Sequence, residues 1–472
     1  MMPKLAKACL LLICLSLMAA GLCGQSLDAP SLASALDKLM SSSLIKDASL
    51  AVAFYSPRDS SLVYGHRIGS ALVPASLQKL YTGIAALETF GPDYRFQTQI
   101  GSRGSIDGKV LRGDVVVIGG GDPSWSEDFY PEGPHRVFEL WADSLRALGI
   151  SRVEGDLVGD ISLHPTYPYS PVWEKTDLAY GWAPAVAALS FNSNLLRFDL
   201  KGASRPGKKA WASSRHGYQY SKVSNQITTV AQPGTAAIWL SADPDGRGIT
   251  LQGKLGVNTP EYLTAAVRNP PLFTLEILRQ TLRAKGIRVS GPTRLETDPA
   301  TSDSLTVLLD FASVPLDKIL AVMLKNSSNM LAEALLCALK AGRDSSAVYL
   351  EQLFSSHGLP ADQFQVLDGS GLARQNLCSA SHLGLALCHA WQQDWFPVFL
   401  DALARPGEEG TLKKRYPDLK GKDLLYAKTG TLRDVSNLAG YLRAADGELY
   451  AFVIICNKVG SIANAKTWQA SV

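Results

Sequence analysis

Apolar positions near the start of the chain follow helical spacing, then strand spacing, then helical spacing again. A short amphipathic helix is predicted over residues 31–40, SLASALDKLM. Two β-rich runs follow, SLAVAFYS at 49–56 and SLVYGHRIG at 61–69, and the proline-containing turn between them predicts a hairpin. Helical spacing returns over residues 76–91, SLQKLYTGIAALETFG, and a glycine closes that segment.

Between residues 93 and 262 the pattern changes to short β-rich runs punctuated by glycine. One helix is predicted in this stretch, over residues 135–149, HRVFELWADSLRALG. The sequence GGGD at 119–122 resembles a phosphate-binding loop, but a proline follows it and no P-loop lysine does, so it predicts a turn. We interpret residues 93–262 as a β-rich insertion.

The rest of the chain is again a mixture of helices and strands. Helical spacing resumes at residues 271–287, and it continues through 315–342 and in the segments after Ser345 and Ser379. Three neighbouring antiparallel strands are predicted at the end, over residues 424–432, 436–444 and 448–457. Because α/β pieces flank the β-rich stretch on both sides, the pattern favours one α/β domain interrupted by an insertion.

The first 24 residues read as a secretory signal peptide. Lys4 and Lys7 precede the apolar run Ala8 to Leu22, which small residues close. The run is short for a membrane anchor, and the bulky Leu22 disfavours lipidation at Cys23. We therefore expect an exported protein of the periplasm or cell envelope.

Composition and charge change this picture little. The chain has 472 residues, 46% of them hydrophobic and 19% charged, as in ordinary globular proteins. Its formal charge of +3 falls to +1 without the two lysines of the signal peptide. Nothing in that balance would recruit nucleic acid or an anionic membrane, so neither is expected as a partner.

The cysteines beyond the signal peptide do not form an evident framework. There are four of them, Cys337, Cys378, Cys388 and Cys456, and their pairing stays open. Cys378 and His382 have the i, i+4 spacing of zinc ligands, and Cys388 and His389 lie close behind. No carboxylate or second motif completes a four-ligand site, so we predict neither a metal nor a cofactor.

Two serines precede a lysine by three residues. Ser43 and Lys46 fall in a polar connection, where that spacing brings no side chains together. Ser76 and Lys79 open a predicted helix, where positions i and i+3 share a face. Ser76 needs an adjacent base to act as a nucleophile, and Lys79 can be that base if its pKa is lowered. The helix N-terminus and a second ammonium group nearby would both lower it.

A second cation is available in a predicted strand. Lys428, Thr429 and Gly430 form the only K-T-G of the chain. There the lysine can face a cleft, the threonine hydroxyl can bind a carboxylate, and the glycine lets substrate lie close to the backbone. An S-x-N stands between helical runs, where Ser327 could relay a proton to the leaving group. Its Asn329 could hold either Lys79 or an amide of the substrate.

The three motifs in this order are the signature of penicillin-interacting serine acyl-transferases. The segments VPASLQKLYTGIAALETFGPDYRFQT, GGGDPSW, GDLVGD, LKNSSNMLAEALL, DGSGLARQN and AKTGTLRDVSNLAGYL extend the match. Together they resemble the D-alanyl-D-alanine carboxypeptidase/endopeptidase family of penicillin-binding protein 4 type, from about residue 31 to 460. A large insertion between the first two motifs marks that family, and here Ser76 and Ser327 are 251 residues apart.

The resemblance implies a fold and an arrangement of domains. The fold is α/β, with a β-lactamase/transpeptidase-like domain made of residues 25–92 and 263–472. The insertion at 93–262 would form a β-rich second domain, with a third nested in it at about 195–235.

The resemblance also implies roles for residues of the three motifs. Ser76 would be acylated and Lys79 would be the general base, while Ser327, Asn329 and Lys428 would relay protons and position the reacting groups. Thr429 and Thr431 would grip the substrate carboxylate beside Gly430. The backbone N–H groups of Ser76 and Thr431 would form the oxyanion hole.

Further contacts follow from the family by position. Arg374 in the DGSGL segment and Asp177 in the insertion would meet the free end of the substrate's side chain. The chain is one residue shorter than the family after Asp177, so Glu174 stays an alternative and the aromatic neighbour is either Tyr180 or Trp182. Arg433 either tunes specificity or faces solvent.

The function implied is a serine D-Ala-D-Ala carboxypeptidase or endopeptidase that acts on peptidoglycan stem peptides and is inhibited by β-lactams. The alternatives are a β-lactamase, which the large insertion disfavours, and a non-catalytic cell-wall binding homologue, which the intact motifs disfavour. The choice between carboxypeptidase and endopeptidase stays open, as do the diamino acid of the substrate, the deacylation rate and the oligomeric state.

Overall fold

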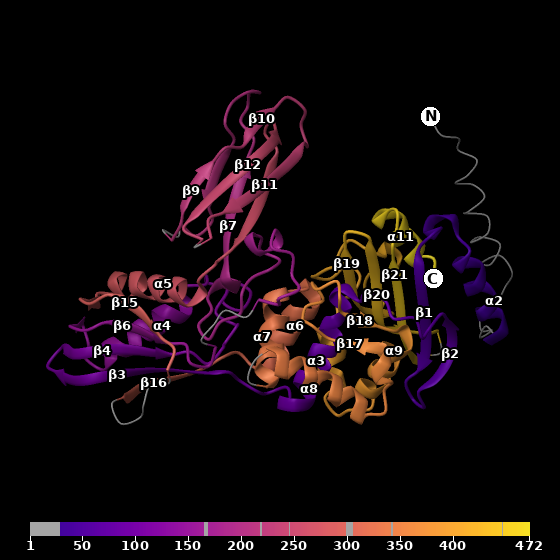
Figure 1. The fold of residues 1–472 in the computed structure, drawn as a ribbon, viewed down its shortest axis with the longest axis horizontal. Coiled ribbons are helices and arrows are strands. Elements are labelled where there is room, and N and C mark those ends of the chain that lie inside the picture. The colour runs from indigo at the N-terminus through magenta and orange to yellow at the C-terminus, as the bar shows by residue number, and fades with distance from the viewer. Residues whose placement is uncertain are drawn as a thin grey trace.

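The computed structural model describes residues 29–164, 169–217, 220–244, 246–298, 305–340, 343–445 and 447–472. The predicted signal peptide at 1–24, with Cys23, lies outside the described residues. The chain folds into three parts: a sheet covered by helices, a second sheet beside it, and a β-rich arm (Figure 1). None of the helices in these ranges combines the length and the apolar character needed to cross a bilayer.

The first part is built on a five-stranded antiparallel sheet. Its strands follow the spatial order β19–β20–β21–β1–β2 and comprise β1 (Ser49–Ser56), β2 (Ser61–His66), β19 (Leu425–Leu432), β20 (Val435–Arg443) and β21 (Leu449–Asn457). The predicted hairpin and the predicted C-terminal strands are therefore present. Pairing of β1 with β21 brings the two ends of the described chain together.

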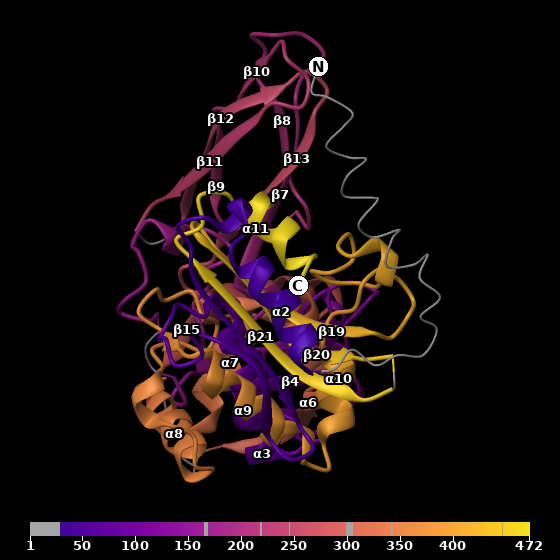
Figure 2. The same cartoon turned by 90° about the vertical axis from the view of Figure 1, so that its right-hand side faces the viewer.

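Both faces of this sheet are buried, because alternate side chains of each strand enter different cores. Ala51 and Ala53 of β1 face the larger core, whereas Leu50 and Val52 face the smaller one. The helices α2 (Ala29–Met40) and α11 (Ile462–Gln469) cover the smaller core (Figure 2). The larger core lies under α3 (Gln78–Phe90), α6 (Leu316–Asn326), α7 (Asn329–Leu339), α8 (Arg343–Ser356), α9 (Ala380–Trp391) and α10 (Phe396–Ala402). A short pair of strands, β17 (Phe364–Gln365) and β18 (Leu377–Cys378), lies among these helices.

The second part is a seven-stranded mixed sheet with two helices on one face (Figure 1). Its strands are β3 (Gln97–Asp107), β4 (Val110–Ile118), β5 (Arg152–Val153), β6 (Leu157–Asp160), β14 (Arg288–Val289), β15 (Thr293–Glu296) and β16 (Thr306–Ala312). The helices are α4 (Arg136–Ala147) and α5 (Pro270–Ala284), whose apolar faces share one core with the sheet.

The third part is the arm that projects from the second (Figures 1 and 2). One of its sheets joins β7 (Leu195–Lys201), β8 (Trp211–Ser214) and β13 (Pro260–Ala266), and the other joins β9 (Lys222–Asn225), β10 (Thr228–Val230), β11 (Ala236–Ala242) and β12 (Gly248–Gly256). The antiparallel pair β7–β13 joins the two ends of the arm, so the chain leaves and re-enters the second part at one place.

The strand pairing moves two of the predicted boundaries. Residues 263–312 were assigned to the transpeptidase-like domain, but α5 and β14–β16 complete the inserted sheet, with Thr306 of β16 opposite Ser102 of β3. The nested part spans 195–266 and not 195–235. The helical pattern of α5 was read correctly, but an amphipathic pattern does not say which sheet the helix covers.

The GGGD segment is not a phosphate loop. A Cβ on Gly120 would lie 1.6 Å from the carbonyl oxygen of Gln97, so the glycine is required where the backbone passes that strand. The carboxyl of Asp122 accepts hydrogen bonds from the backbone N–H and the hydroxyl of Ser124. The segment is a packed connection after β4.

Candidate active site

Ser76 lies in a short 3-10 turn, Ala75–Leu77, which leads directly into α3. The preceding residue, Ala75, is fully buried and has a φ of +48°, a left-handed conformation that is uncommon for alanine. Gly371 packs against it so closely that a Cβ there would lie 1.8 Å from the carbonyl oxygen of Ala75. This packing holds the turn in a conformation that the isolated chain would avoid.

Two asparagines of the sheet hold the segment that precedes the turn. Asn437 of β20 donates from Nδ2 to the carbonyl oxygens of Val73, at 3.0 Å, and Pro74, at 2.8 Å. Asn457 at the end of β21 accepts the N–H of Val73 at 2.7 Å. Ser76 is thereby fixed relative to the sheet as well as to its helix.

The ammonium group of Lys79 is surrounded by three acceptors. Its Nζ lies 3.0 Å from Oγ of Ser76, 2.7 Å from Oδ1 of Asn329 and 2.6 Å from the carbonyl oxygen of Ser370. A neutral amine has two N–H groups and one lone pair. If the amide and the carbonyl take the two N–H groups, the lone pair points at the serine hydroxyl, which is the geometry of a general base.

Burial lowers the pKa of Lys79 to about 7, although the nearby Asp368 and Glu333 carboxylates act in the opposite direction. Burial lowers the pKa of Lys428 well below its ordinary value, and the charge of Lys79 lowers it further. Both lysines are fully buried. Desolvation is therefore the largest cause of the lowered pKa of both lysines, and the repulsion that we expected between the two amines adds to it.

Lys428 of β19 contacts Ser327 of the S-x-N motif. Its Nζ lies 2.8 Å from Oγ of Ser327 and 2.7 Å from the carbonyl oxygen of Thr429. Ser327 ends α6 in the left-handed conformation, with a φ of +61°, so its side chain turns away from the helix toward β19. The amine and the hydroxyl can exchange a proton over this distance.

Asn329 begins α7 and holds Lys79, the first of the two options that the sequence left open. Its Nδ2 donates to the carbonyl oxygen of Trp182 at 2.6 Å. The asparagine therefore joins Lys79 to the inserted part of the chain.

Gly430 also has a packing role that the sequence did not indicate. A Cβ there would lie 2.8 Å from the carbonyl oxygen of Pro74 and 3.3 Å from Cβ of Ala75. The glycine allows β19 to pack against the turn that carries Ser76, and this places Thr431 in the same cleft as the serine. Thr429 precedes it on β19 and is partly buried.

Buried carboxylates shape the loop that provides the carbonyl of Ser370. Glu333 of α7 accepts the backbone N–H groups of Gly369 and Ser370 at 3.1 and 2.8 Å. Asp368 accepts those of Gly371 and Ala373 at 2.7 and 2.6 Å. These bonds fix the direction of the carbonyl that faces Lys79.

Trp173 connects this loop to the insertion. Its indole Nε1 donates to Asp368 at 2.7 Å, in a buried contact. Sequence reasoning missed Trp173, Asp368, Glu333 and the two asparagines of the sheet. Asp368, Glu333 and Asn437 lie in segments that resemble the family, but the sequence alone did not indicate which residues they contact.

A cleft of about 840 Å³ opens above Ser76. Its walls are formed by Ser76, Val172, Glu174, Asp177, Trp182, Asn329, Gly371, Leu372, Arg374, Gln375, Thr431, Leu432, Arg433 and Asp434. One wall comes from the insertion and carries two acidic groups, Glu174 and Asp177. The opposite wall follows β19 and carries both basic and acidic side chains.

The residues carried over by position all reach this cleft. Asp177 begins a 3-10 turn, and Glu174 lies beside it in the same wall, so the structure does not separate the two. Arg374 forms an ion pair with Asp434 at 2.7 Å. The exposed Arg433 also lines the cleft.

Two aromatic side chains of the insertion stack on each other beside the cleft. Tyr180 and Trp182 stack with their ring centroids 4.2 Å apart, and Trp182 lines the cleft. Of the two, Trp182 is the side chain that lines the cleft, and Tyr180 stacks against it.

The rejected motifs lie elsewhere. Ser43 is in a surface 3-10 turn, Ser43–Ile45, and both it and Lys46 are exposed.

Burial raises the pKa of the Cys378 thiol to about 12, and His382 bonds to the hydroxyl of Tyr81 at 2.9 Å. His389 turns toward Glu88 instead. All four cysteines, Cys337, Cys378, Cys388 and Cys456, are buried.

The chain is similar to several known proteins over most of its length. A D-alanyl-D-alanine carboxypeptidase of Actinomadura sp. (strain R39) is 27% identical over 413 residues, which cover 84% of this chain and 75% of that protein. The D-alanyl-D-alanine carboxypeptidase DacB of Haemophilus influenzae is 27% identical over 401 residues, covering 82% and 80%. The crystal structure of penicillin-binding protein 4 from Haemophilus influenzae has a TM-score of 0.79 at 23% identity, covering 94% of this chain and 98% of that one.

The structural likeness confirms the predicted fold class, a transpeptidase-like α/β domain with additional β-rich domains. Residues 32–472 match the model of the D-Ala-D-Ala carboxypeptidase 3 (S13) family. This match extends over nearly all of the described chain and confirms the predicted resemblance. The chain belongs to the D-Ala-D-Ala carboxypeptidase 3 (S13) family.

Proposed function

We propose that the protein cleaves the terminal D-Ala-D-Ala bond of peptidoglycan stem peptides through an acyl-enzyme on Ser76. The observation that carries the proposal is the placement of a fully buried lysine, with a pKa of about 7, 3.0 Å from the hydroxyl of Ser76. Membership of a D-Ala-D-Ala carboxypeptidase family supports the bond class. β-Lactams, which carry a comparable acyl group, are expected to acylate the same serine.

In the proposed acylation one proton is transferred, an ester bond to Ser76 forms and the C–N bond of the substrate breaks. Oγ of Ser76 attacks the carbonyl carbon of the penultimate D-Ala while Nζ of Lys79 accepts the hydroxyl proton. The backbone N–H groups of Ser76 and Thr431 stabilise the oxyanion. The C–N bond then breaks, and the proton that Lys79 accepted passes to the leaving amine through the hydroxyl of Ser327, which lies 2.8 Å from Lys428. Water then takes the place of the amine and attacks the ester carbonyl, and its proton passes back along this route to Oγ of Ser76, which leaves.

Substrate binding is proposed for the wall that follows β19. The terminal carboxylate would bind the hydroxyls of Thr429 and Thr431, and Gly430 would keep this part of the strand against the Ser76 turn. Export to the periplasm or cell envelope, implied by the signal peptide at 1–24, would bring the enzyme to such substrates.

A purified muropeptide digest tests the function. Incubation with pentapeptide monomers should release free D-alanine, and prior treatment with benzylpenicillin should prevent it. Peptide-bridged dimers included in the same digest would show endopeptidase activity as conversion to monomers. Intact substrates together with rapid turnover of penicillin would instead indicate a β-lactamase, and intact substrates with no acylation would indicate a binding protein.

The rate of acylation should rise with pH through about 7. Lys79 acts as a base only when neutral, and its neutral fraction increases as the pH passes its pKa of about 7. At pH 5 the acylation rate should therefore be about a hundredfold below its plateau. Stopped-flow acylation by a chromogenic cephalosporin between pH 5 and 9 measures this profile. A profile that is flat across this range would contradict the role of Lys79.

The insertion should contribute to peptide binding and not to penicillin binding. If Asp177 reaches the free ammonium group at the end of the stem-peptide side chain, it provides remote binding energy that orients the reacting carbonyl. Asp177→Ala should lower kcat/KM for such peptides about 10- to 100-fold and leave penicillin acylation within about twofold.

Capping that ammonium group on the substrate supplies the control for Asp177. Capping should reproduce the loss in the unmodified enzyme, and the two changes should not add in combination. If capping has no effect, or if penicillin acylation falls equally, Asp177 is structural and Glu174→Ala is the next variant to measure.

A further inference from the structure

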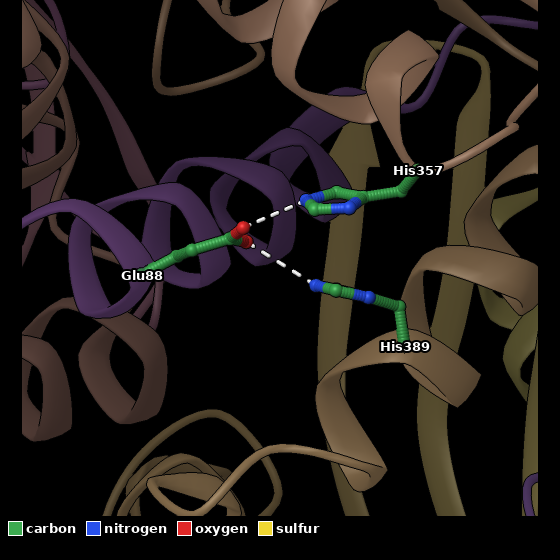
Figure 3. A group of neighbouring side chains, drawn as sticks. All are labelled: Glu88, His357 and His389. Atoms are coloured by element: carbon green, nitrogen blue, oxygen red, sulfur yellow. Dashed lines mark hydrogen bonds and ion pairs between the residues drawn. The ribbon is translucent and has the colours of Figure 1, made fainter.

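Three side chains converge at the far end of the helix that carries Lys79. Glu88 lies in the last turn of α3, His357 follows α8, and His389 lies in α9 (Figure 3). Oε1 of Glu88 is 2.7 Å from Nε2 of His357, and Oε2 is 3.2 Å from Nε2 of His389. The ligand atoms of all three lie within 4.8 Å of one another.

The two imidazoles present the same nitrogen to the same carboxylate. Their ring centroids are 3.9 Å apart, with planes inclined by 24°. Each ring thus directs Nε2 to the space that the carboxylate also faces, and an ion placed there would have all three side chains as ligands.

The chemistry of the three ligands favours zinc. Imidazole nitrogen and carboxylate oxygen are ordinary ligands of Zn²⁺, and two histidines with one glutamate leave a fourth position for water. The side chains are about 24%, 23% and 16% exposed for His357, Glu88 and His389, so an ion and a water molecule can reach them. Of the described residues, no other group of three such ligands lies this close together.

We propose that Glu88, His357 and His389 bind one divalent transition-metal ion, with Zn²⁺ the best match. The ion ties the C-terminal end of α3 to α9 and to the segment after α8. It lies about 18 Å along the helix from Ser76, twelve residues at the rise of an α-helix, so its role is to stabilise the domain and not to enter the reaction. In the sequence no carboxylate was found to complete a zinc site near His389, because Glu88 lies 301 residues away in the chain.

Zinc alone is the probe for the test. The protein, prepared without a polyhistidine tag and stripped with a chelator, should take up one equivalent of Zn²⁺ in a calorimetric titration. At a hundredfold excess of free Zn²⁺ over its Kd, Tm should rise by about 5 °C or more. Magnesium should cause no such rise, because it prefers oxygen ligands.

Variants locate the site. Glu88→Gln and His389→Asn should each weaken Zn²⁺ binding more than tenfold and remove most of the rise in Tm. Both should keep their penicillin acylation, which also shows that they fold. His216→Asn is the matched control, because His216 also contacts a glutamate, Glu127 at 3.2 Å, but belongs to no group of three close ligands among the described residues. It should bind zinc as the unmodified protein does.

X-ray absorption of the zinc-loaded unmodified protein gives a readout that needs no variant. Two imidazole ligands at about 2.0–2.1 Å are expected. The proposal is overturned if the unmodified protein takes up no zinc at micromolar concentration. Equal uptake by the unmodified protein and the Glu88 and His389 variants, or a spectrum without imidazole ligands, would also overturn it.

Discussion

Lys79→Arg should lower the rate of acylation by benzylpenicillin by about 10³-fold or more. The arginine keeps a positive charge and hydrogen-bond donors near Asn329 and Ser370, but its guanidinium does not lose its proton and cannot act as a base. The variant therefore separates the two functions that Lys79 could have. Pseudo-first-order rates of adduct formation, followed by intact mass, measure the effect.

Lys79→Met provides the matched comparison. Methionine fills the buried space with an apolar chain, and it removes both the base and the donors to Asn329 Oδ1 and the Ser370 carbonyl. It should be as inactive as the arginine variant and less stable, because two buried acceptors lose their partner. If Lys79→Arg acylates at nearly the rate of the unmodified protein, positive charge and not proton transfer is what the site needs.

Lys428→Ala should slow acylation by about 10²- to 10³-fold and leave the domain folded. The change removes the group that lies 2.8 Å from Ser327, and with it the path for a proton to the leaving amine. Lys428→Arg should restore little, since a planar guanidinium neither gives up a proton nor fits the same position. Thermal unfolding of each variant checks the fold.

The pair Lys428 and Ser327 can be examined as a unit. If they act through one hydrogen bond, Ser327→Ala should cost a similar factor, and the double variant should be little slower than either single variant. Additive losses would mean that the two residues act separately. Acylation of Lys428→Ala at the unmodified rate would remove Lys428 from the mechanism.

Much of the transpeptidase-like part could be predicted from local pattern. The hairpin β1–β2 and the strands β19–β21 carry apolar runs bounded by turn residues, and the structure has them where they were expected. The S-x-x-K pair was separated from its decoy on helical spacing alone, and the structure brings the hydroxyl of Ser76 and the amine of Lys79 together.

The hydrophobic pattern predicts helices and strands, but it does not predict which distant segments each of them contacts. Helix α5 was recognised, but the sheet it covers joins β14–β16, which follow the helix, to β3–β6, which lie far earlier in the chain. Amphipathic spacing contains no information about such a partner. The same holds for Asn437, which looks like one polar residue in an apolar strand. In the structure its side chain holds the backbone ahead of Ser76.

The cause of the lowered pKa values of Lys79 and Lys428 also could not be predicted from the sequence. The two motif lysines suggested mutual repulsion as a cause of a lowered pKa. In the structure burial is the larger cause, and it lowers the pKa of Lys79 to about 7 although Asp368 and Glu333 act in the opposite direction. Burial is a property of the whole packed domain and cannot be read from the motifs.

Peptide mapping after benzylpenicillin treatment tests the central claim most directly. The claim is that Ser76 is the residue that forms the acyl-enzyme, because only its hydroxyl faces a buried lysine among the two S-x-x-K pairs. The account predicts one penicilloyl adduct per chain, located on the peptide that contains Ser76, and none in Ser76→Ala. An adduct that persists in Ser76→Ala, or one that maps to Ser43, would contradict it.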